Sequence, residues 1–269
     1  MVTSNNKELK IYMKVNETNY LPSHVDWHET NSAGSLDVDL SHRIGQLLTQ
    51  SITENGCASI AVSGGRSPIG LFEELSKINL DWSKVELTLV DERWVDAKND
   101  DSNELLVRKH LIKNKTSQIK FFPVINSAKS VKEGQVLYEK VLQQLKLPFD
   151  IIVLGMGDDG HTASLFPCCK ELGQAMDPDN QQKCIVTKPK NAPYERITLT
   201  FSTISKAKNL ILHMRGSSKL HTFELAMTLK DAKKMPIYAF TEQPLSIYWS
   251  PYIDDYDVMF FNKYKLSKY

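Results

Sequence analysis

The chain has 269 residues, which is enough for one large domain or two small ones with a buried core. Apolar residues make up 41% and charged residues 24%, as in ordinary soluble globular proteins, and the formal net charge is +1. This balance indicates neither nucleic acid nor a membrane surface as a partner, so any anion site is expected to be local and built from a few residues.

The sequence shows neither an export signal nor a membrane-spanning run. The first 30 residues are polar and lack an apolar h-region, and no run of 18 apolar residues is present, so we expect no signal peptide and no membrane span. The cysteines form no CxxC pair and show no zinc-ligand spacing, which predicts free thiols in a reducing compartment and a cytoplasmic location. They are Cys57, Cys168, Cys169 and Cys184.

Helical periodicity and short apolar runs alternate along the chain. Leu40, Ile44 and Leu48 predict a helix over 40–52 that ends at Gly56, and a buried strand follows at 57–62. Ser67-Pro68 has the pattern of an N-cap followed by proline at the first helical position. Further strands are predicted at 85–90, 119–122, 151–154, 184–187, 196–201 and 209–213, and further helices at 102–112, 131–145 and 217–229.

This alternation of strands and helices predicts the fold class. It favours an α/β protein with a mainly parallel sheet and helices on both faces. No internal repeat, low-complexity block or linker divides the chain, so we expect a single domain over residues 1–269. Residues before about 20 carry no recognisable motif.

Three predicted strands run into unusual loops, at 63–68, 91–94 and 155–161. In open parallel sheets, ligands bind beyond the carboxyl ends of the strands. All three loops should therefore open at the same edge of the sheet. Their convergence predicts a ligand site there more strongly than any one loop does alone.

The first loop, Ser63-Gly64-Gly65-Arg66, has the features of an anion site. Glycines let the backbone approach a ligand closely, and a helix that begins after the loop directs free N–H groups at it, which suits a phosphate. A turn that only needs flexible glycines would look the same. No P-loop and no GxGxxG pattern is present, which disfavours a nucleotide site.

The second loop places an acid beside a base, in Asp91-Glu92-Arg93. Together Asp91 and Arg93 could hold sugar hydroxyls and a phosphate. The alternative is a charged surface turn. Farther along, Lys188, Lys190 and Arg196 could clamp an anion from the far side, and solvated surface charges are the alternative for the lysines.

The third loop contains the predicted catalytic residue, His161. Its ordinary pKa near 6.5 suits a general base at neutral pH. Either Asp158 or Asp159 could orient the imidazole and stabilise its protonated form. Glycines, including Gly157, would let this backbone pass close to a substrate. The other six histidines are expected to be structural or solvated. They are His24, His28, His42, His110, His213 and His221.

Two other kinds of hydrolytic site find no support in the sequence. A serine nucleophile in such a fold would usually lie in a GxSxG elbow, and none exists. A metal site would need several patterned ligands, and no HExxH or second histidine cluster accompanies His161. We therefore predict direct attack by a water molecule that histidine activates, with no metal or cofactor.

With these residues assembled, the sequence resembles the 6-phosphogluconolactonases of the glucosamine-6-phosphate isomerase/6-phosphogluconolactonase family. The resemblance extends over roughly residues 25–250, and the glycine-histidine block is its most specific part. The matching segments are Ser63-Gly64-Gly65, Asp91-Glu92-Arg93-Trp94, Asp100-Asp101-Ser102-Asn103, the block from Gly155 to Pro167 with its Asp159-Gly160-His161-Thr162-Ala163-Ser164-Leu165-Phe166 core, and Arg196-Ile197-Thr198-Leu199-Thr200.

The resemblance implies a modified doubly wound, Rossmann-like domain, as in glucosamine-6-phosphate deaminase and ribose-5-phosphate isomerase. It implies hydrolysis of 6-phospho-D-glucono-1,5-lactone, the second step of the oxidative pentose phosphate pathway. It also implies that His161 activates the water with Asp159 as its partner. The implied substrate-binding residues are Ser63, Gly64, Gly65, Arg66, Asp91, Arg93, Gly157, Lys190 and Arg196, with the phosphate held by the 63–66 loop, Arg93, Lys190 and Arg196.

The chain departs from the family pattern at one position. The family usually has a lysine five residues before the strand arginine, and Asn191 holds that place here, so the role is assigned to Lys190, with Lys188 as the alternative. Two other functions stay open: a sugar-phosphate isomerase or deaminase on the same scaffold, and a sugar-phosphate sensor without catalysis. Functional coupling to glucose-6-phosphate dehydrogenase also stays open.

Overall fold

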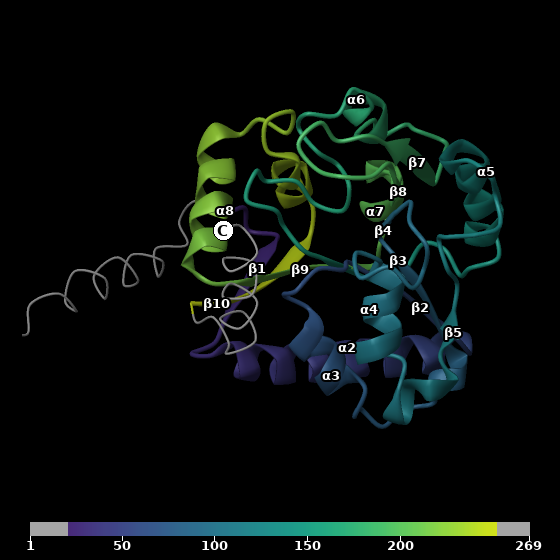
Figure 1. The fold of residues 1–269 in the computed structure, drawn as a ribbon. Helices are drawn as coiled ribbons and strands as arrows, with labels where there is room; N and C mark the ends of the chain where they lie inside the picture. The colour runs from purple at the N-terminus through teal and green to yellow at the C-terminus, as the bar shows by residue number, and fades with distance from the viewer. Residues whose placement is uncertain (1–20, 252–269) are drawn as a thin grey trace, which may run out of the picture.

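The computed structural model describes residues 21–251 (Figure 1). The prediction for residues 1–20, and the ends of a domain spanning 1–269, lie outside the described residues. The main sheet has seven strands, and each neighbouring pair is parallel. Their spatial order is β1 (Val25–Glu29), β10 (Leu245–Ser250), β9 (Asn209–Arg215), β6 (Ile151–Leu154), β2 (Ala58–Val62), β3 (Val85–Leu89) and β5 (Lys120–Phe121).

The central parallel strands are buried on both faces. β2 and β6 read ASIAV and IIVL, and every residue in them is buried. Fully buried strands that are almost entirely apolar are typical of parallel sheets between two helical layers, whereas a half-exposed strand would alternate apolar and polar residues. The predicted mainly parallel sheet is confirmed.

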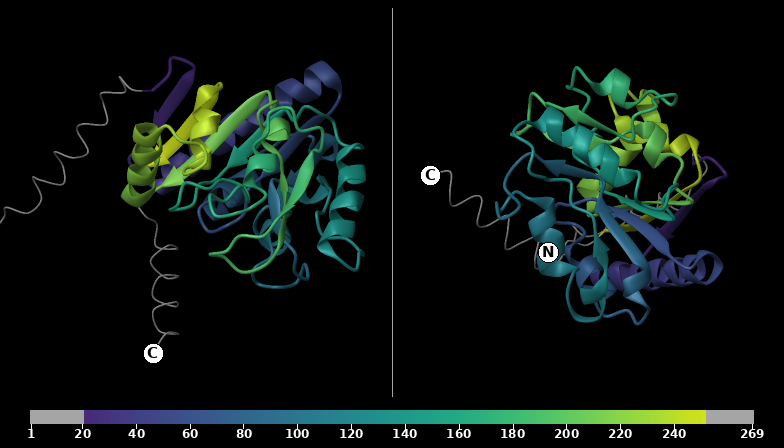
Figure 2. Two further views of the ribbon diagram at one scale, coloured as in Figure 1. Left: turned by 90° about the horizontal axis from the view of Figure 1, so that it is seen from above. Right: turned by 90° about the vertical axis from the view of Figure 1, so that its right-hand side faces the viewer.

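Helices lie on both faces of the main sheet. In Figure 1, α2 (Ala33–Asn55) and α3 (Ile69–Leu75) lie below the strands and α8 (Ser217–Leu229) lies above them. The right-hand view of Figure 2 shows α2, in purple, again below the strands. The remaining helices are α4 (Asn103–His110), α5 (Val131–Leu142), α6 (Leu172–Ala175), α7 (Phe201–Ile204) and the 3-10 segments η1 (Trp82–Lys84), η2 (Asn114–Gln118) and η3 (Pro236–Glu242). Within residues 21–251, no helix is both long and apolar enough to cross a membrane.

A second, smaller sheet was not predicted. It is antiparallel, in the order β4 (Asp91–Arg93), β8 (Arg196–Leu199) and β7 (Cys184–Thr187). The segment after β3, interpreted from the sequence as a loop, is therefore a short strand. It turns away from the main sheet and pairs with β8, so Arg93 lies directly opposite Arg196.

Several boundary predictions need correction. The helix predicted at 131–145 ends at Leu142, and the strand predicted at 209–213 continues to Arg215. Ser67 is not an N-cap, because Pro68 occupies that position and no side chain caps α3. The strand predicted at 196–201 ends at Leu199, and a helix begins at Phe201. The helix predicted at 40–52 begins earlier, at Ala33, but it ends as expected, with Gly56 at φ 79°. β1 and β10 were not predicted.

The topology brings the loops together. The chain runs from β2 to β3 on one side of β2, and β6 later pairs with the other side of β2. The switch point of the sheet therefore lies between β2 and β6. Two hydrogen bonds join the carboxyl ends of these strands, because Ser63 N–H donates to the Val153 carbonyl at 2.9 Å and Gly155 N–H donates to the side-chain Oγ of Ser63 at 3.2 Å. The loops that follow β2 and β6 are thereby held side by side.

Candidate active site

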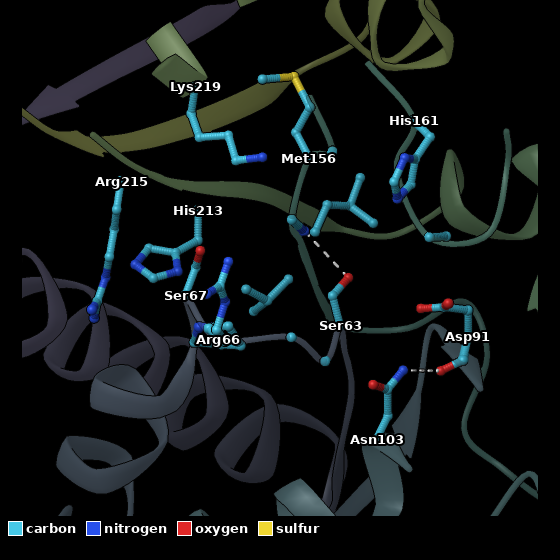
Figure 3. A pocket seen from close by; sticks show the side chains of 18 of the residues that line it. Ser63, Arg66, Ser67, Asp91, Asn103, Met156, His161, His213, Arg215 and Lys219 are labelled. Atoms are coloured by element: carbon cyan, nitrogen blue, oxygen red, sulfur yellow. Dashed lines mark hydrogen bonds between the residues drawn. The ribbon is translucent and has the colours of Figure 1, made fainter. Parts of the chain in front are cut away.

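A cavity of about 330 Å³ opens at this edge of the sheet (Figure 3). Most of the predicted site residues line it, so the expected convergence of the three loops is observed. Those that line it are Ser63, Gly64, Gly65, Arg66, Asp91, Arg93, Gly157, His161 and Arg196. Asp159 lies behind His161, and Lys190 is exposed and outside the cavity lining, so its contact with a substrate stays a prediction. The alternative lysine, Lys188, is also exposed, and its ammonium lies 3.7 Å from Glu195.

The imidazole of His161 is held from three directions. Its Nδ1 lies 2.5 Å from Oδ1 of Asp159. Its ring stacks on Phe166, with the ring centroids 3.9 Å apart and the planes 24° apart. Gly157 abuts the ring so closely that a Cβ at this position would overlap imidazole atoms. A hydrogen bond to Asp159 through Nδ1–H leaves Nε2 with its lone pair, which is the form that accepts a proton.

Asp159 is suited to orient this ring. Burial by itself would raise the pKa of Asp159, but the hydrogen bond and the charge of His161 outweigh burial and lower the pKa below its ordinary value. An ionised carboxylate at this distance favours the Nδ1–H tautomer and stabilises the imidazolium once it forms. Of the two acids that the sequence left open, Asp159 is the one whose carboxylate contacts the imidazole of His161.

Asp158 instead points to the other side of the cavity, where its carboxylate pairs with Lys219 at 2.6 Å. In Figure 3, His161, Asp91 and Asn103 lie on one side of the cavity. The other side holds Arg66, His213, Arg215 and Lys219. We call the first group the histidine end and the second group the basic end.

At the histidine end, the small sheet and the 161–166 segment are joined by polar contacts. Ser164 Oγ donates to Oδ2 of Asp91 at 2.5 Å and lies 3.4 Å from Nη1 of Arg196. The Arg196 guanidinium also lies over the Phe166 ring, with Cζ 5.0 Å from its centroid. Asp91, Arg196 and the imidazole of His161 are therefore linked through Ser164 and Phe166.

Glu92 stabilises the start of α4, next to the histidine end of the cavity. Strand alternation turns its side chain away from the face that carries Asp91 and Arg93. Its fully buried carboxylate accepts N–H bonds from Asn103 at 2.9 Å and Glu104 at 2.7 Å, so it caps the start of α4. Burial raises the pKa of Glu92, although these backbone donors act in the opposite direction.

Asn103 is positioned by that cap and lines the cavity. Its amide donates to the Asp91 carbonyl at 2.9 Å, and its side-chain oxygen abuts Gly64, where any Cβ would collide with it. Asn103 thus connects the second loop, through the Asp91 carbonyl, to the first loop, at Gly64. This gives Gly64 a specific reason to be glycine.

At the basic end, two of the cations already have carboxylate partners. Asp37 on α2 forms a buried ion pair with Arg215, and Oδ1 of Asp37 lies 3.5 Å from Nε2 of His213. Burial lowers the pKa of His213, with Asp37 opposing and Arg215 reinforcing the shift. Lys219 is paired with Asp158. The first turn of α8, which begins after Gly216, also lines this end.

Sequence reasoning missed Asn103, His213, Arg215 and Lys219 as cavity residues. His213 and Arg215 lie at the end of β9, where polar and apolar residues alternate as in many ordinary strands, so nothing local marks them as cavity residues. Lys219 could have been found, because Gly216-Ser217-Ser218 follows a strand and opens a long helix, which is the setting of an anion site. In residues 21–251, no three His, Cys, Asp or Glu side chains are arranged to hold a metal ion.

The fold and this cavity define an α/β protein with a polar site at the switch point of a mainly parallel sheet, and comparison shows to which family it belongs. Residues 31–249 match the family of glucosamine-6-phosphate isomerases/6-phosphogluconolactonase, so the chain belongs to this family. A 6-phosphogluconolactonase from Pseudomonas aeruginosa is 40% identical over 231 residues, which are 86% of this chain and 97% of that protein.

Solved structures agree with this assignment. The crystal structure of a 6-phosphogluconolactonase from Shewanella baltica matches with a TM-score of 0.82 and 38% identity, over 86% of this chain and 99% of the other. A monomeric glucosamine-6-phosphate deaminase matches with a TM-score of 0.69 and 16% identity, over 84% of this chain and 97% of the other. At that identity the second likeness concerns the fold alone, and it confirms the predicted deaminase-like fold.

Proposed function

We propose that this protein hydrolyses 6-phospho-D-glucono-1,5-lactone to 6-phospho-D-gluconate, the second step of the oxidative pentose phosphate pathway. The observation that carries the proposal is the Asp159–His161 pair at one end of a cavity whose other end is basic. A phosphorylated lactone has matching ends, a reactive carbonyl and a phosphate. Relatives named 6-phosphogluconolactonase support the same reaction.

In this proposal His161 is the general base. Asp159 holds Nδ1–H, and Nε2 takes a proton from a water molecule as that water attacks C1 of the lactone. A positioned base contributes about 10²–10⁴-fold to a rate. A δ-lactone is an activated ester that also hydrolyses unaided, so this contribution and a modest stabilisation of the oxyanion suffice.

We place the phosphate at the basic end. Arg66 and Lys219 line this end, together with the glycine loop after β2 and the first turn of α8. The 13-residue helix α8 has no side chain at its cap, because the cap residue is Gly216, so its first N–H groups are available to an anion. Binding the phosphate here would direct C1 towards His161 and would lower the entropy cost of the attack.

The test compares His161→Ala with a matched control, His42→Ala, whose side chain is exposed on α2. The substrate is freshly generated 6-phosphogluconolactone, and acid release is followed in a pH-stat. We expect His161→Ala to lower kcat by about 10²–10⁴-fold with little change in KM, while His42→Ala retains wild-type kinetics. A folded His161→Ala variant with wild-type kcat would remove His161 from the base role.

The isomerase or deaminase alternative is separated by a second substrate. Ammonia release from glucosamine 6-phosphate should be absent from wild-type protein. Tight binding of sugar phosphates without turnover of either substrate would instead favour a sensor.

A further inference from the structure

Two arginines face each other across the small sheet. β4 and β8 are antiparallel, and their register places Arg93 directly opposite Arg196. Both line the cavity. Like charges at opposed positions of neighbouring strands destabilise a sheet, so this arrangement needs compensation from a negative charge.

Among the described residues, no acidic side chain forms an ion pair with either arginine. Within residues 21–251, no carboxylate pairs with either guanidinium, in contrast to Arg215 and Lys219, which are paired with Asp37 and Asp158. Arg196 is only 6% exposed, and its Nε has no hydrogen-bond partner in the described part of the chain. The hydrogen bonds that its other nitrogens make are long, at 3.4 Å to Ser164 Oγ and 3.4 Å to the Pro193 carbonyl.

A buried guanidinium in this state is costly, and an anion that enters the cavity would offset the cost. Burial lowers the pKa of Arg196, and the charge of Asp91 opposes that shift. An arginine side chain nevertheless stays protonated in proteins. Arg196 is therefore a fixed positive charge whose hydrogen-bonding capacity is incompletely used.

The position of Arg196 indicates which anion it meets. Its guanidinium and the imidazole of His161 contact the same Phe166 ring. It also contacts Ser164, which donates to Asp91, so it belongs to the histidine end of the cavity. If the phosphate lies at the basic end, the negative charge near Arg196 is the one that develops at the lactone carbonyl.

We propose that Arg196, with Arg93 opposite it, stabilises the oxyanion formed at C1 of the lactone and then the carboxylate of the product. This inference rests on the proposed lactonase function. Attack forms a bond from the water oxygen to C1, a water proton passes to Nε2 of His161, and the carbonyl π electrons move to the exocyclic oxygen beside Arg196. The C1–O5 bond then breaks, O5 takes the proton from His161, and the new carboxylic acid ionises.

The first experiment separates this role from phosphate binding. Hydrolysis of 6-phosphogluconolactone and of unphosphorylated D-glucono-1,5-lactone is measured for wild type, Arg196→Gln, Arg196→Lys and Lys219→Gln. We expect Arg196→Gln to lower kcat by about 10²-fold on both lactones, as loss of an oxyanion donor does. Arg196→Lys should recover part of the loss, because it keeps the charge without the planar fork. Lys219→Gln should affect only the phosphorylated lactone.

A loss for Arg196→Gln that is confined to the phosphorylated lactone would overturn the inference and return Arg196 to the phosphate. An Arg196→Gln variant with a raised KM and an unchanged kcat for 6-phosphogluconolactone would also overturn the inference. If wild type does not accelerate hydrolysis of 6-phosphogluconolactone at all, the proposed function fails first. The two failures are therefore distinguishable.

A binding measurement decides the question even if the unphosphorylated lactone is a poor substrate. 6-Phosphogluconate and glucitol 6-phosphate share the phosphate and the carbon chain but differ at C1, where only the first has a carboxylate. By calorimetry, wild type should prefer 6-phosphogluconate, and Arg196→Gln should reduce that preference by roughly 10- to 100-fold. An unchanged preference in a folded Arg196→Gln variant would contradict the inference.

Discussion

Replacing Gly157 by alanine tests how closely the imidazole of His161 is confined. The added Cβ would overlap Cε1 and Nδ1 of His161 and would lie 2.9 Å from Oδ1 of Asp159. Carbon atoms in ordinary contact are about 3.5–4.0 Å apart. The added Cβ would lie 2.1 Å from Cε1, so the imidazole must move by at least about 1.4 Å. A displacement of about 1 Å in a reacting group can cost about 10²-fold in rate. We expect kcat for the lactone to fall by about that factor.

The matched control is Gly173→Ala in α6. A Cβ at Gly173 meets no atom within 4 Å, so the same chemical change is made where there is space. Initial rates of acid release and thermal unfolding are measured for both variants. Gly173→Ala should keep wild-type kcat. If Gly157→Ala is folded and also keeps wild-type kcat, the imidazole is not confined in the way the structure indicates.

Three further predictions follow from groups around the cavity. Asp159→Asn should lower kcat by about 10²–10⁴-fold with KM nearly unchanged, because the amide does not enforce the Nδ1–H tautomer of His161; equal kcat values would refute this. Glu92→Gln should lower the free energy of unfolding in urea by about 2–4 kcal/mol, because buried N–H donors at the start of α4 lose acceptors; a change below about 0.5 kcal/mol would refute it. The pKa of His213 is lower in the folded chain than in the unfolded chain, so the unfolded chain binds more protons as the pH falls. The stability that neutral, buried His213 contributes is therefore complete above about pH 6.5 and declines as the pH falls through the lowered pKa. Urea unfolding at about pH 7.5 and 5.5 should show this decline, and a His213→Gln variant with an unchanged pH slope would argue against it.

The sequence predicted β6 and the loop that follows it well, because their signals are local. β6 is a continuous apolar run, and the boundaries predicted for it, 151–154, are those observed. Glycines and a histidine directly after such a strand mark a ligand loop in a parallel sheet. α8 was also predicted with its observed bounds, 217–229.

The missed features depend on contacts between distant segments. β4 is only three residues long and pairs with a strand about a hundred residues later, so no local pattern separates it from a charged turn. Glu92 is equally hidden, since a glutamate next to an arginine reads as surface charge until α4 covers it. His213 was expected to be structural or solvated, and it is buried beside Asp37. The sequence did not predict that it also lines the cavity, which follows from the end of β9 lying at this edge of the sheet.

The central claim is that this cavity accelerates opening of a phosphorylated lactone, and the rate of acid release from fresh 6-phosphogluconolactone tests it most directly. The rate with wild-type protein is compared with the spontaneous rate at the same pH and temperature. We predict an acceleration that scales with protein concentration and disappears in His161→Ala. A rate equal to the spontaneous background would contradict the claim.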